Sequence, residues 1–215
     1  MRRRKLLQVV LFATLLLALV LVQISCGGHS SNSSNGPGNN SSFNSTQDIC
    51  TCVENEPASS DYRTQAKHVD LPQIAANEIN VATVLGWPVG TDPAFDAPRQ
   101  GRELQMFHIA NAFLQLVWMN PGDCDLHLEI SDSPDKNAQR IIVETPHSNS
   151  YCGQRRALAQ ALTAHGVTIS TTGVELVTPL PVDVLGLAFQ DFNHSRGSPK
   201  VATPWELHPA VVTVK

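Results

Sequence analysis

The sequence lacks several features that would point to a particular class of protein. It has no basic run after Lys5 and a formal net charge of -4, so no nucleic acid is expected as a partner through phosphate neutralisation. It contains no GxSxG, no HExxH, no P-loop and no GxGxxG in a strand–helix setting, the short motifs of many hydrolases, zinc proteases and nucleotide-binding proteins. No internal repeat is present. No cofactor is therefore expected from motifs alone.

The first 26 residues have the composition of an export signal. A basic start, MRRRK, precedes an apolar run from Leu6 to Val22, which at about 17 residues is at the low edge of what spans a bilayer. The residues before Cys26 are similar to a bacterial lipobox, although Gln23 replaces the preferred Leu. We expect residues 1–26 to be a signal peptide and Cys26 to carry a lipid that anchors the chain to a membrane. Plain secretion and an uncleaved anchor are the alternatives.

Residues 27–48 consist almost entirely of Gly, Ser and Asn. Such residues bury too little apolar surface to offset the entropy of ordering, so this segment is predicted to be a disordered tether. Residues 49–215 then suit one compact domain. An exported domain on a tether implies an address in the cell envelope, or a secreted protein, with an unknown ligand outside the cytoplasm.

Five cysteines are present, and setting Cys26 aside leaves Cys50, Cys52, Cys124 and Cys152. An even number in an exported domain favours two disulfides. Cys50 and Cys52 are too close in sequence to pair comfortably, so each is expected to bond to Cys124 or Cys152, with the connectivity left open. A zinc site is the rival interpretation, but the CxC spacing is weak for zinc.

The domain is predicted to be mainly β, or α+β by content. Patterns of β-branched and alternating apolar residues favour strands at 79–87, 103–119, 125–131, 139–146, 182–192 and 205–215, although 103–119 also admits a helix. A helix is expected at 152–166, with Asn149 or Ser150 as its N-cap and Gly166 as its C-cap. Gly186 suggests a bulge, and Pro209 an edge or bulge position. One helix between middle and late strands is typical of a small OB-like Greek-key barrel.

Four segments, GDCDLHLEI, IIVETP, FQDFNH and WELHPAV, resemble a group of exported bacterial proteins with no established activity. The resemblance covers about 78–214, with two departures at Cys124 and Ala210. The resemblance implies a fold and a location outside the cytoplasm, but no catalytic activity. The residues that match the pattern are Asp123, Asp125, His127, Glu144, Pro146, His194, Trp205, Glu206, His208 and Pro209.

Two of these segments place acidic and histidine side chains at every second position. In a strand, Asp125, His127 and Glu129 share one face, and Glu206 and His208 share another. If the two strands are neighbours, histidines and carboxylates meet on one surface, a set that binds divalent ions or performs acid–base chemistry. Glu144, His147 and His194 are further candidates: Glu144 and His147 lie at or just after the end of an intervening strand, and His194 lies in a later loop.

The simpler interpretation is that these residues form the solvated or structurally bonded face of half-buried strands. Arg155 and Arg156 are likewise expected to be solvated, and Trp205 to be part of the core. We therefore expect a non-enzymatic binding domain whose candidate site is Asp125, His127, Glu144, His194, Glu206 and His208. The alternative is a metal-dependent hydrolase, similar to a nuclease or phosphodiesterase, with Asp125, His127, Glu206 and His208 as ligands.

Overall fold

The computed structural model describes residues 48–52, 61–193 and 200–215. The predicted signal peptide, Cys26, nearly all of the predicted tether and His194 lie outside the described residues. Within the described part, no helix is both long and apolar enough to cross a membrane.

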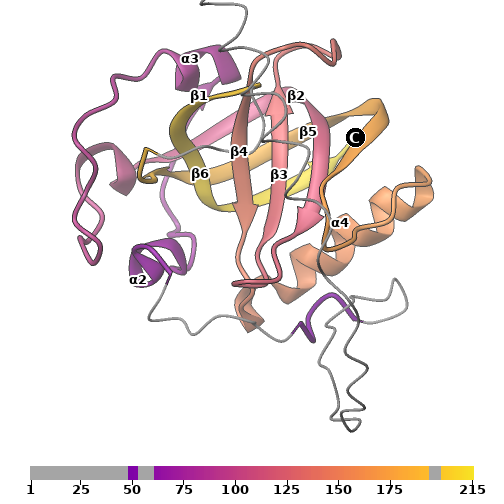
Figure 1. Cartoon of the computed structure of the whole chain (residues 1–215), viewed down its shortest axis with the longest axis horizontal. Helices are drawn as coiled ribbons and strands as arrows, with labels where there is room; N and C mark the ends of the chain where they lie inside the picture. Colours follow the sequence, from indigo (N-terminus) through magenta and orange to yellow (C-terminus); the bar gives the residue numbers. More distant parts are fainter. Residues whose placement is uncertain (1–47, 53–60, 194–199) are drawn as a thin grey trace, which may run out of the picture. The chain divides into compact units, whose positions relative to one another are not determined.

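Five strands close into a barrel, as the sequence predicts (Figure 1). The sheet order is β1-β2-β3-β4-β6-β5, and β2 also pairs with β5, which closes the ring and leaves β1 as an addition beside β2. The β1–β2 and β4–β6 pairs are parallel and the others antiparallel. The strands are β1 (Ala76–Ile79), β2 (Met106–Met119), β3 (Leu126–Ser131), β4 (Arg140–Thr145), β5 (Val174–Gln190) and β6 (Val201–Val214).

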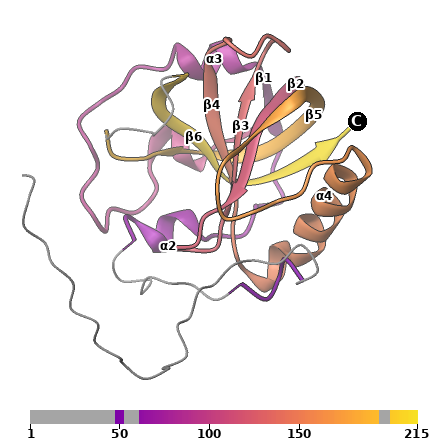
Figure 2. The ribbon, with the colours of Figure 1, turned by 45° about the vertical axis from the view of Figure 1, so that its right-hand side comes forward.

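The helices close the barrel and connect its strands. The main helix, α4, lies between β4 and β5 in the chain, the position expected for an OB-like barrel. Figures 1 and 2 show α3 and α4 at opposite ends of the barrel, and both contribute apolar side chains to its core. The helical segments are α2 (Thr64–Lys67), α3 (Val81–Leu85), the 3-10 turns η2 (Gly101–Leu104) and η3 (Asn149–Tyr151), and α4 (Cys152–Ala164).

The segments in which apolar and polar residues alternate fold as strands because their apolar face packs into the core. Leu126, Leu128 and Ile130 of β3 are fully buried, and Trp205 and Leu207 of β6 join the same core. The long segment that admitted either helix or strand is β2, a strand. The opposite face of β3, β4 and β6 is not the wet surface that alternation suggested. The polar side chains on this face are also largely buried, so they must find their hydrogen-bond and ion-pair partners within the protein.

The predicted strand at 79–87 is wrong for most of its length, because the chain turns into α3 after Ile79. The side chain of Asn80 accepts a hydrogen bond from the Thr83 amide and caps this helix. The carboxylate of Asp132 accepts two more, from the amides of Val81 and Ala82. Three amides at the helix start are thereby satisfied, which outweighs the β-propensity of the β-branched residues.

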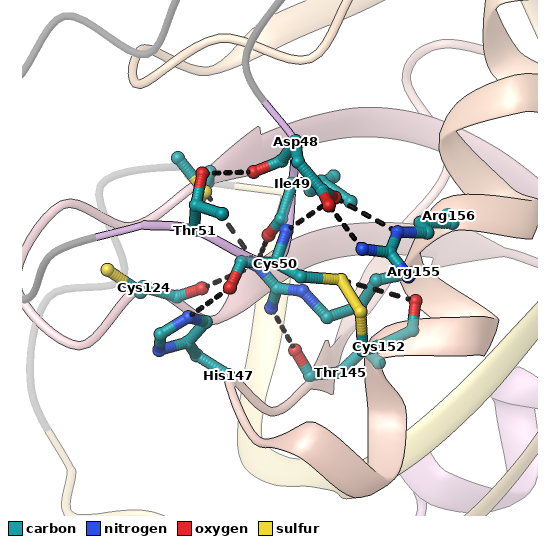
Figure 3. The surroundings of a disulfide bond; sticks show 11 residues. Asp48, Ile49, Cys50, Thr51, Cys124, Thr145, His147, Cys152, Arg155 and Arg156 are labelled. Carbon is teal, nitrogen blue, oxygen red and sulfur yellow. Dashed lines mark hydrogen bonds and ion pairs between the residues drawn. A yellow bond between two sulfur atoms is a disulfide. The ribbon is translucent and has the colours of Figure 1, made fainter.

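Two bridges join the first described segment to the barrel, which confirms the predicted disulfides. Cys50 is bonded to Cys152 and Cys52 to Cys124. The expected solvation of Arg155 is wrong: it is fully buried, and it donates to the carbonyls of Thr145, Ile49 and Cys124 (Figure 3). Arg156 instead pairs with Asp48 at the surface.

The predicted irregularity near Gly186 and Pro209 is present where β5 meets β6. The register shifts between Gly186 and Ala188, and the His208–Pro209 peptide is cis. A Cβ at Gly186 would lie 2.8 Å from Cβ of Ala210 and 2.9 Å from the Pro209 carbonyl, so only glycine fits. The helix N-cap is Tyr151 and not the predicted Asn149 or Ser150, because a 3-10 turn precedes α4. Gly166 adopts the positive φ of 74° expected after a helix end.

Candidate functional site

The sequence interpretation required the two histidine-bearing strands to be neighbours. In the structure these strands, β3 and β6, are not adjacent. β4 lies between β3 and β6 and pairs with both. In this register His127 lies opposite Glu144, and Glu206 lies opposite Ile142. The two strands nevertheless present their polar side chains to one space, because the Glu144 side chain of the central strand reaches both of them.

Glu144 connects the two histidines. Its Oε1 is 2.8 Å from Nδ1 of His127, and its Oε2 is 2.9 Å from Nδ1 of His208. Glu206 joins from the same side, with Oε1 3.5 Å from Nδ1 of His208. Four of the predicted site residues therefore form one connected set.

Asp125 contacts the other ring nitrogen of His208. Its Oδ2 is 3.1 Å from Nε2 of His208 and 3.0 Å from Nε2 of His68. His68 directly follows the short helix α2 and was missed in the sequence, where residues 49–77 show no periodicity from which its position could be inferred. The complete set, called the His–carboxylate cluster below, comprises His68, Asp125, His127, Glu144, Glu206 and His208.

The backbone around Asp125 fixes the direction of its carboxylate. Its Oδ1 accepts a 2.6 Å hydrogen bond from the His147 amide, which leaves Oδ2 for the two imidazoles. Cys124, in a disulfide, has a φ of 64° in the left-handed region and so sharpens the turn before Asp125. The Arg155 guanidinium donates a 2.9 Å hydrogen bond to the Cys124 carbonyl. The Asp125 side chain is therefore held by the His147 amide, and the residue before it is held by a disulfide and a buried hydrogen bond.

His208 is the centre of the cluster and is fully buried. Both ring nitrogens lie within about 3 Å of carboxylate oxygens, but among the described residues neither makes a hydrogen bond with acceptable angles. Burial alone would lower the pKa of His208, but the carboxylates of Asp125, Glu144 and Glu206 raise it well above its ordinary value. The surrounding carboxylates therefore favour the protonated form of the metal-free imidazole.

The pKa values of Asp125 and Glu144, two carboxylates that contact His208, shift downward. Burial would raise the pKa of Asp125, but the imidazoles of His208 and His68 lower it below its ordinary value. The pKa of Glu144 is lowered in the same way, against its burial, by His127 and His208. His127 has a raised pKa because Glu144 outweighs the effect of burial. Asp123 is the exception: burial and the charges of Asp125 and Glu144 raise its pKa to about 7.

Residues 61–68, called the covering segment below, bring His68 and Lys67 to the cluster. Arg99 joins this segment to the strands, since its guanidinium donates to the carbonyls of Ala66, Ala188 and His208. Arg63 in turn forms a buried ion pair with Glu103 at 2.7 Å. Lys67 is 7% exposed and lies 3.2 Å from Asp61. The segment is thus firmly attached to the strands that carry the cluster.

Other candidate residues have different roles or lie elsewhere. Glu129 pairs with the buried Arg140 at 2.8 Å, so it belongs to a structural ion pair and not to the cluster. The His147 side chain is directed toward the Cys50 carbonyl, at 3.4 Å from Nε2 (Figure 3). Trp205 is buried in the core and donates to the Pro88 carbonyl. His194 is outside the described residues.

Two sets of ligand atoms in the cluster have the spacing of a cation site. His68, Asp125 and His208 form one, and Glu144, Glu206 and His208 the other, with all ligand atoms of each within 4.8 Å of one another. A surface groove of about 660 Å³ runs beside the covering segment, but no cluster residue lines it; its lining is Asp61, Arg63, Thr64, Gln65, Ala66, Val69 and residues 95–99. Within the cluster, Asp125, Glu144, Glu206 and His208 are buried, whereas His68 and His127 are half-buried.

The chain matches no protein-family model, and no similar curated protein or solved structure was found. The resemblance to exported bacterial proteins stays a prediction.

Proposed function

We propose that this chain is an exported, lipid-anchored, OB-like domain that binds a single divalent transition metal ion, zinc above all, through His68, Asp125 and His208. The observation that carries the proposal is the convergence of three ligand atoms from distant parts of the chain. Oδ2 of Asp125 lies 3.0 Å from Nε2 of His68 and 3.1 Å from Nε2 of His208.

The spacing of these atoms suits a small tetrahedral ion. Ligand atoms at about 2.05 Å from zinc in a tetrahedron are about 3.3 Å apart, so only a small outward shift is needed to admit the ion. Two imidazoles and one carboxylate are ordinary zinc ligands. The carboxylate is also oriented, because Oδ1 of Asp125 is held by the His147 amide. Support of this kind from residues behind the ligands is typical of metal sites.

The state of His208 gives independent support. A fully buried imidazole without a well-aligned hydrogen bond is costly, and a metal bond at Nε2 would satisfy one of its two nitrogens. Glu144 would then accept the Nδ1 proton at 2.9 Å, the carboxylate–histidine–metal arrangement that fixes the tautomer.

Burial argues for binding over hydrolysis. Asp125 and His208 are 0% exposed and Glu206 is 2% exposed, so a phosphodiester or peptide would have to displace the covering segment to reach the ion. A hydrolytic metal needs an open coordination position for water and substrate. The burial of Asp125 and His208 therefore favours binding over the hydrolase alternative.

The two disulfides fit a domain that folds outside the reducing cytoplasm. They support the exported part of the proposal, and Cys26 supplies its lipid-bearing residue. Mass spectrometry of the mature protein tests the anchor, with an N-terminal diacylglyceryl-modified Cys26 expected. An unmodified N-terminus at another residue would remove the lipid and leave a secreted protein.

The metal is tested on the full-length exported protein after removal of divalent ions with a chelator. Calorimetric titration with Zn²⁺ is expected to give one ion per chain, and the melting temperature is expected to rise. At a free zinc concentration of about 100 times Kd the free energy of unfolding increases by about 2.7 kcal/mol. His68→Ala should weaken zinc binding about 100-fold or more, since even a supporting residue is worth 10–100-fold.

His108→Ala is the matched control, because His108 also contacts a carboxylate, that of Glu78 at 2.8 Å, but lies outside the cluster. It should bind zinc as the unaltered protein does. A folded protein that takes up no zinc, or a loss of affinity equal in both variants, would refute the site and leave the cluster as a structural charge network.

A further inference from the structure

Away from the His–carboxylate cluster, Arg102 of η2 rests on two tryptophans. Its guanidinium carbon lies 4.6 Å from the centroid of the Trp87 ring and 5.2 Å from the centroid of the Trp205 ring. The two indoles are nearly perpendicular, with an interplanar angle of 86° and centroids 5.4 Å apart. They form a corner with two aromatic walls, and the faces of such rings attract a cation. The corner thus fixes the position of the guanidinium.

Each indole of the corner has a further partner that holds it. Nε1 of Trp205 donates to the Pro88 carbonyl at 3.0 Å, and the Trp87 ring packs against Phe107, with centroids 5.0 Å apart. Both indoles are buried, whereas Arg102 is half-buried. An arginine stacked on aromatic rings keeps the N–H groups at its edge for hydrogen bonds. The corner therefore presents a positioned fork of donors at the surface.

Within the described part of the chain, the guanidinium of Arg102 has no hydrogen-bond or ion-pair partner. The hydrogen bond that this residue does make is accepted by its carbonyl, from the Gln105 amide at 2.9 Å. The adjacent Glu103 is bonded through both carboxylate oxygens to Arg63, at 2.7 Å and 2.9 Å. Covering a charge is costly when no partner offsets the loss of water. A ligand that carries negative charge would supply the missing partner.

The surface beside the corner is apolar. Leu104, in the same turn as Arg102, is 60% exposed, and Val89, which follows Pro88 in the chain, is 49% exposed. A ligand that suits both features has an oxyanion next to an apolar body. Phosphate suits the guanidinium, because two of its oxygens accept parallel hydrogen bonds from the fork. Basic side chains beside exposed apolar ones are also typical of surfaces that lie in the headgroup region of a membrane.

We propose that Arg102 binds the phosphate group of a membrane lipid, with Leu104 and Val89 against the apolar part of the same lipid. The proposal goes beyond the zinc site and is independent of it; only the choice of a lipid as the source of the phosphate draws on the proposed anchor at Cys26. An anchored domain is held close to the headgroups, so the local concentration of phosphate is high and a weak contact is enough to orient the domain.

The test is a titration of the exported protein that follows the side-chain Nε–H signal of Arg102 in nitrogen-15 NMR spectra. The probes are inorganic phosphate, monomeric dihexanoylphosphatidylcholine and hexyl glucoside, an amphiphile without phosphate. The signal should shift with the first two probes and not with the third. The short-chain lipid should bind about 10-fold more tightly than inorganic phosphate, because it also covers the apolar side chains.

Variants separate the charge from the apolar contact. Arg102→Gln should weaken lipid binding, measured by tryptophan fluorescence, by about 10-fold or more, because it removes a charge-assisted bidentate pair. Leu104→Ser should weaken binding of the lipid several-fold and leave that of inorganic phosphate unchanged. Arg156→Gln is the matched control: it removes the same charge from a surface pair with Asp48 and should bind the lipid as the unaltered protein does.

The outcomes decide between the possible ligands. An Arg102 signal that does not respond to either phosphate probe, or responds equally to hexyl glucoside, would overturn the anion site, as would equal losses in Arg102→Gln and Arg156→Gln. Equal affinities for phosphate and lipid, unchanged by Leu104→Ser, would identify free phosphate as the ligand and overturn the lipid. If Arg102→Gln does not fold, Arg102→Lys serves, because it keeps the charge, loses the planar fork and should still weaken binding. Failure of the zinc site affects none of these results.

Discussion

Oδ2 of Asp125 lies 3.1 Å from Nε2 of His208, although these residues belong to segments that do not pair in the sheet. Asp125 comes from the turn before β3, and His208 from the bulged part of β6 beside Pro209. The contact depends on β4, which separates β3 from β6 and whose Glu144 holds the opposite nitrogen of the same imidazole.

Glu144→Gln is expected to destabilise the metal-free protein strongly. Its carboxylate pairs with both His127 and His208, and removing one partner of a buried pair costs about 3–5 kcal/mol. Urea denaturation at pH 6 measures this loss. Glu78→Gln removes the exposed partner of His108 and should change the free energy of unfolding by less than about 0.5 kcal/mol. Equal losses of unfolding free energy for the two substitutions would show that the buried ion pairs of Glu144 stabilise the fold no more than an exposed pair does.

The free energy of unfolding of the metal-free protein should decrease both in acid and in alkali. The pKa of His208 is raised in the fold, so its contribution is complete below its unfolded pKa of about 6.5 and is lost as the pH rises through its folded pKa. The pKa values of Asp125 and Glu144 are lowered, so their contribution is present above about pH 4 and is lost in acid.

Denaturation curves from pH 3 to pH 9 in the presence of a chelator should therefore show greatest stability at about pH 4–6.5. Zinc binding should follow the opposite trend over the alkaline limb, because the metal competes with the proton on His208 and gains as the pH rises. Stability of the metal-free protein that increases steadily from pH 6.5 to pH 9 would contradict a buried imidazolium.

The two disulfides should contribute similarly to stability and differently to metal binding. They span 102 and 72 residues, so by the chain-entropy model each is worth about 4.5 kcal/mol. Cys52→Ser with Cys124→Ser releases the residue that precedes Asp125 and should weaken zinc binding at least about 10-fold, as for loss of a supporting residue. Cys50→Ser with Cys152→Ser acts at the start of α4 and should weaken it much less. The reverse order of affinities would show that the turn at Cys124 does not position Asp125.

Gly186→Ala and Gly153→Ala should have opposite effects. A methyl group at Gly186 meets the Ala210 side chain and the Pro209 carbonyl within 3 Å, and such overpacking costs about 1–3 kcal/mol. A methyl group at Gly153 in α4 meets no other atom within 4 Å and should stabilise the helix by up to about 1 kcal/mol. Thermal melts compare the two. Because Gly186 lies opposite the bulge that carries His208, Gly186→Ala should also weaken zinc binding; unchanged affinity would show that the bulge is not needed to place the imidazole.

The barrel was predictable because β3 and β6 alternate apolar and polar residues, and because turn residues separate the other apolar segments. The sequence also placed Asp125, His127, Glu144, Glu206 and His208 among the candidates, since they alternate with those apolar residues. His68 and Lys67 lie in an irregular segment, where no period relates a residue to its neighbours in space. Arg155 was misjudged because its long side chain reaches carbonyls that come from three separate segments. α3 was misjudged because its capping carboxylate, that of Asp132, comes from far along the chain.

The parallel pairing of β4 with β6 places the last strand of the chain inside the closed ring, between β4 and β5. This strand carries Glu206 and His208, whereas Asp125 and Glu144 come from the turn before β3 and from β4. The carboxylates of Asp125 and Glu144 can therefore share an imidazole only when the C-terminal strand is paired on both of its edges. Closure of the barrel and assembly of the cluster are in this sense one event.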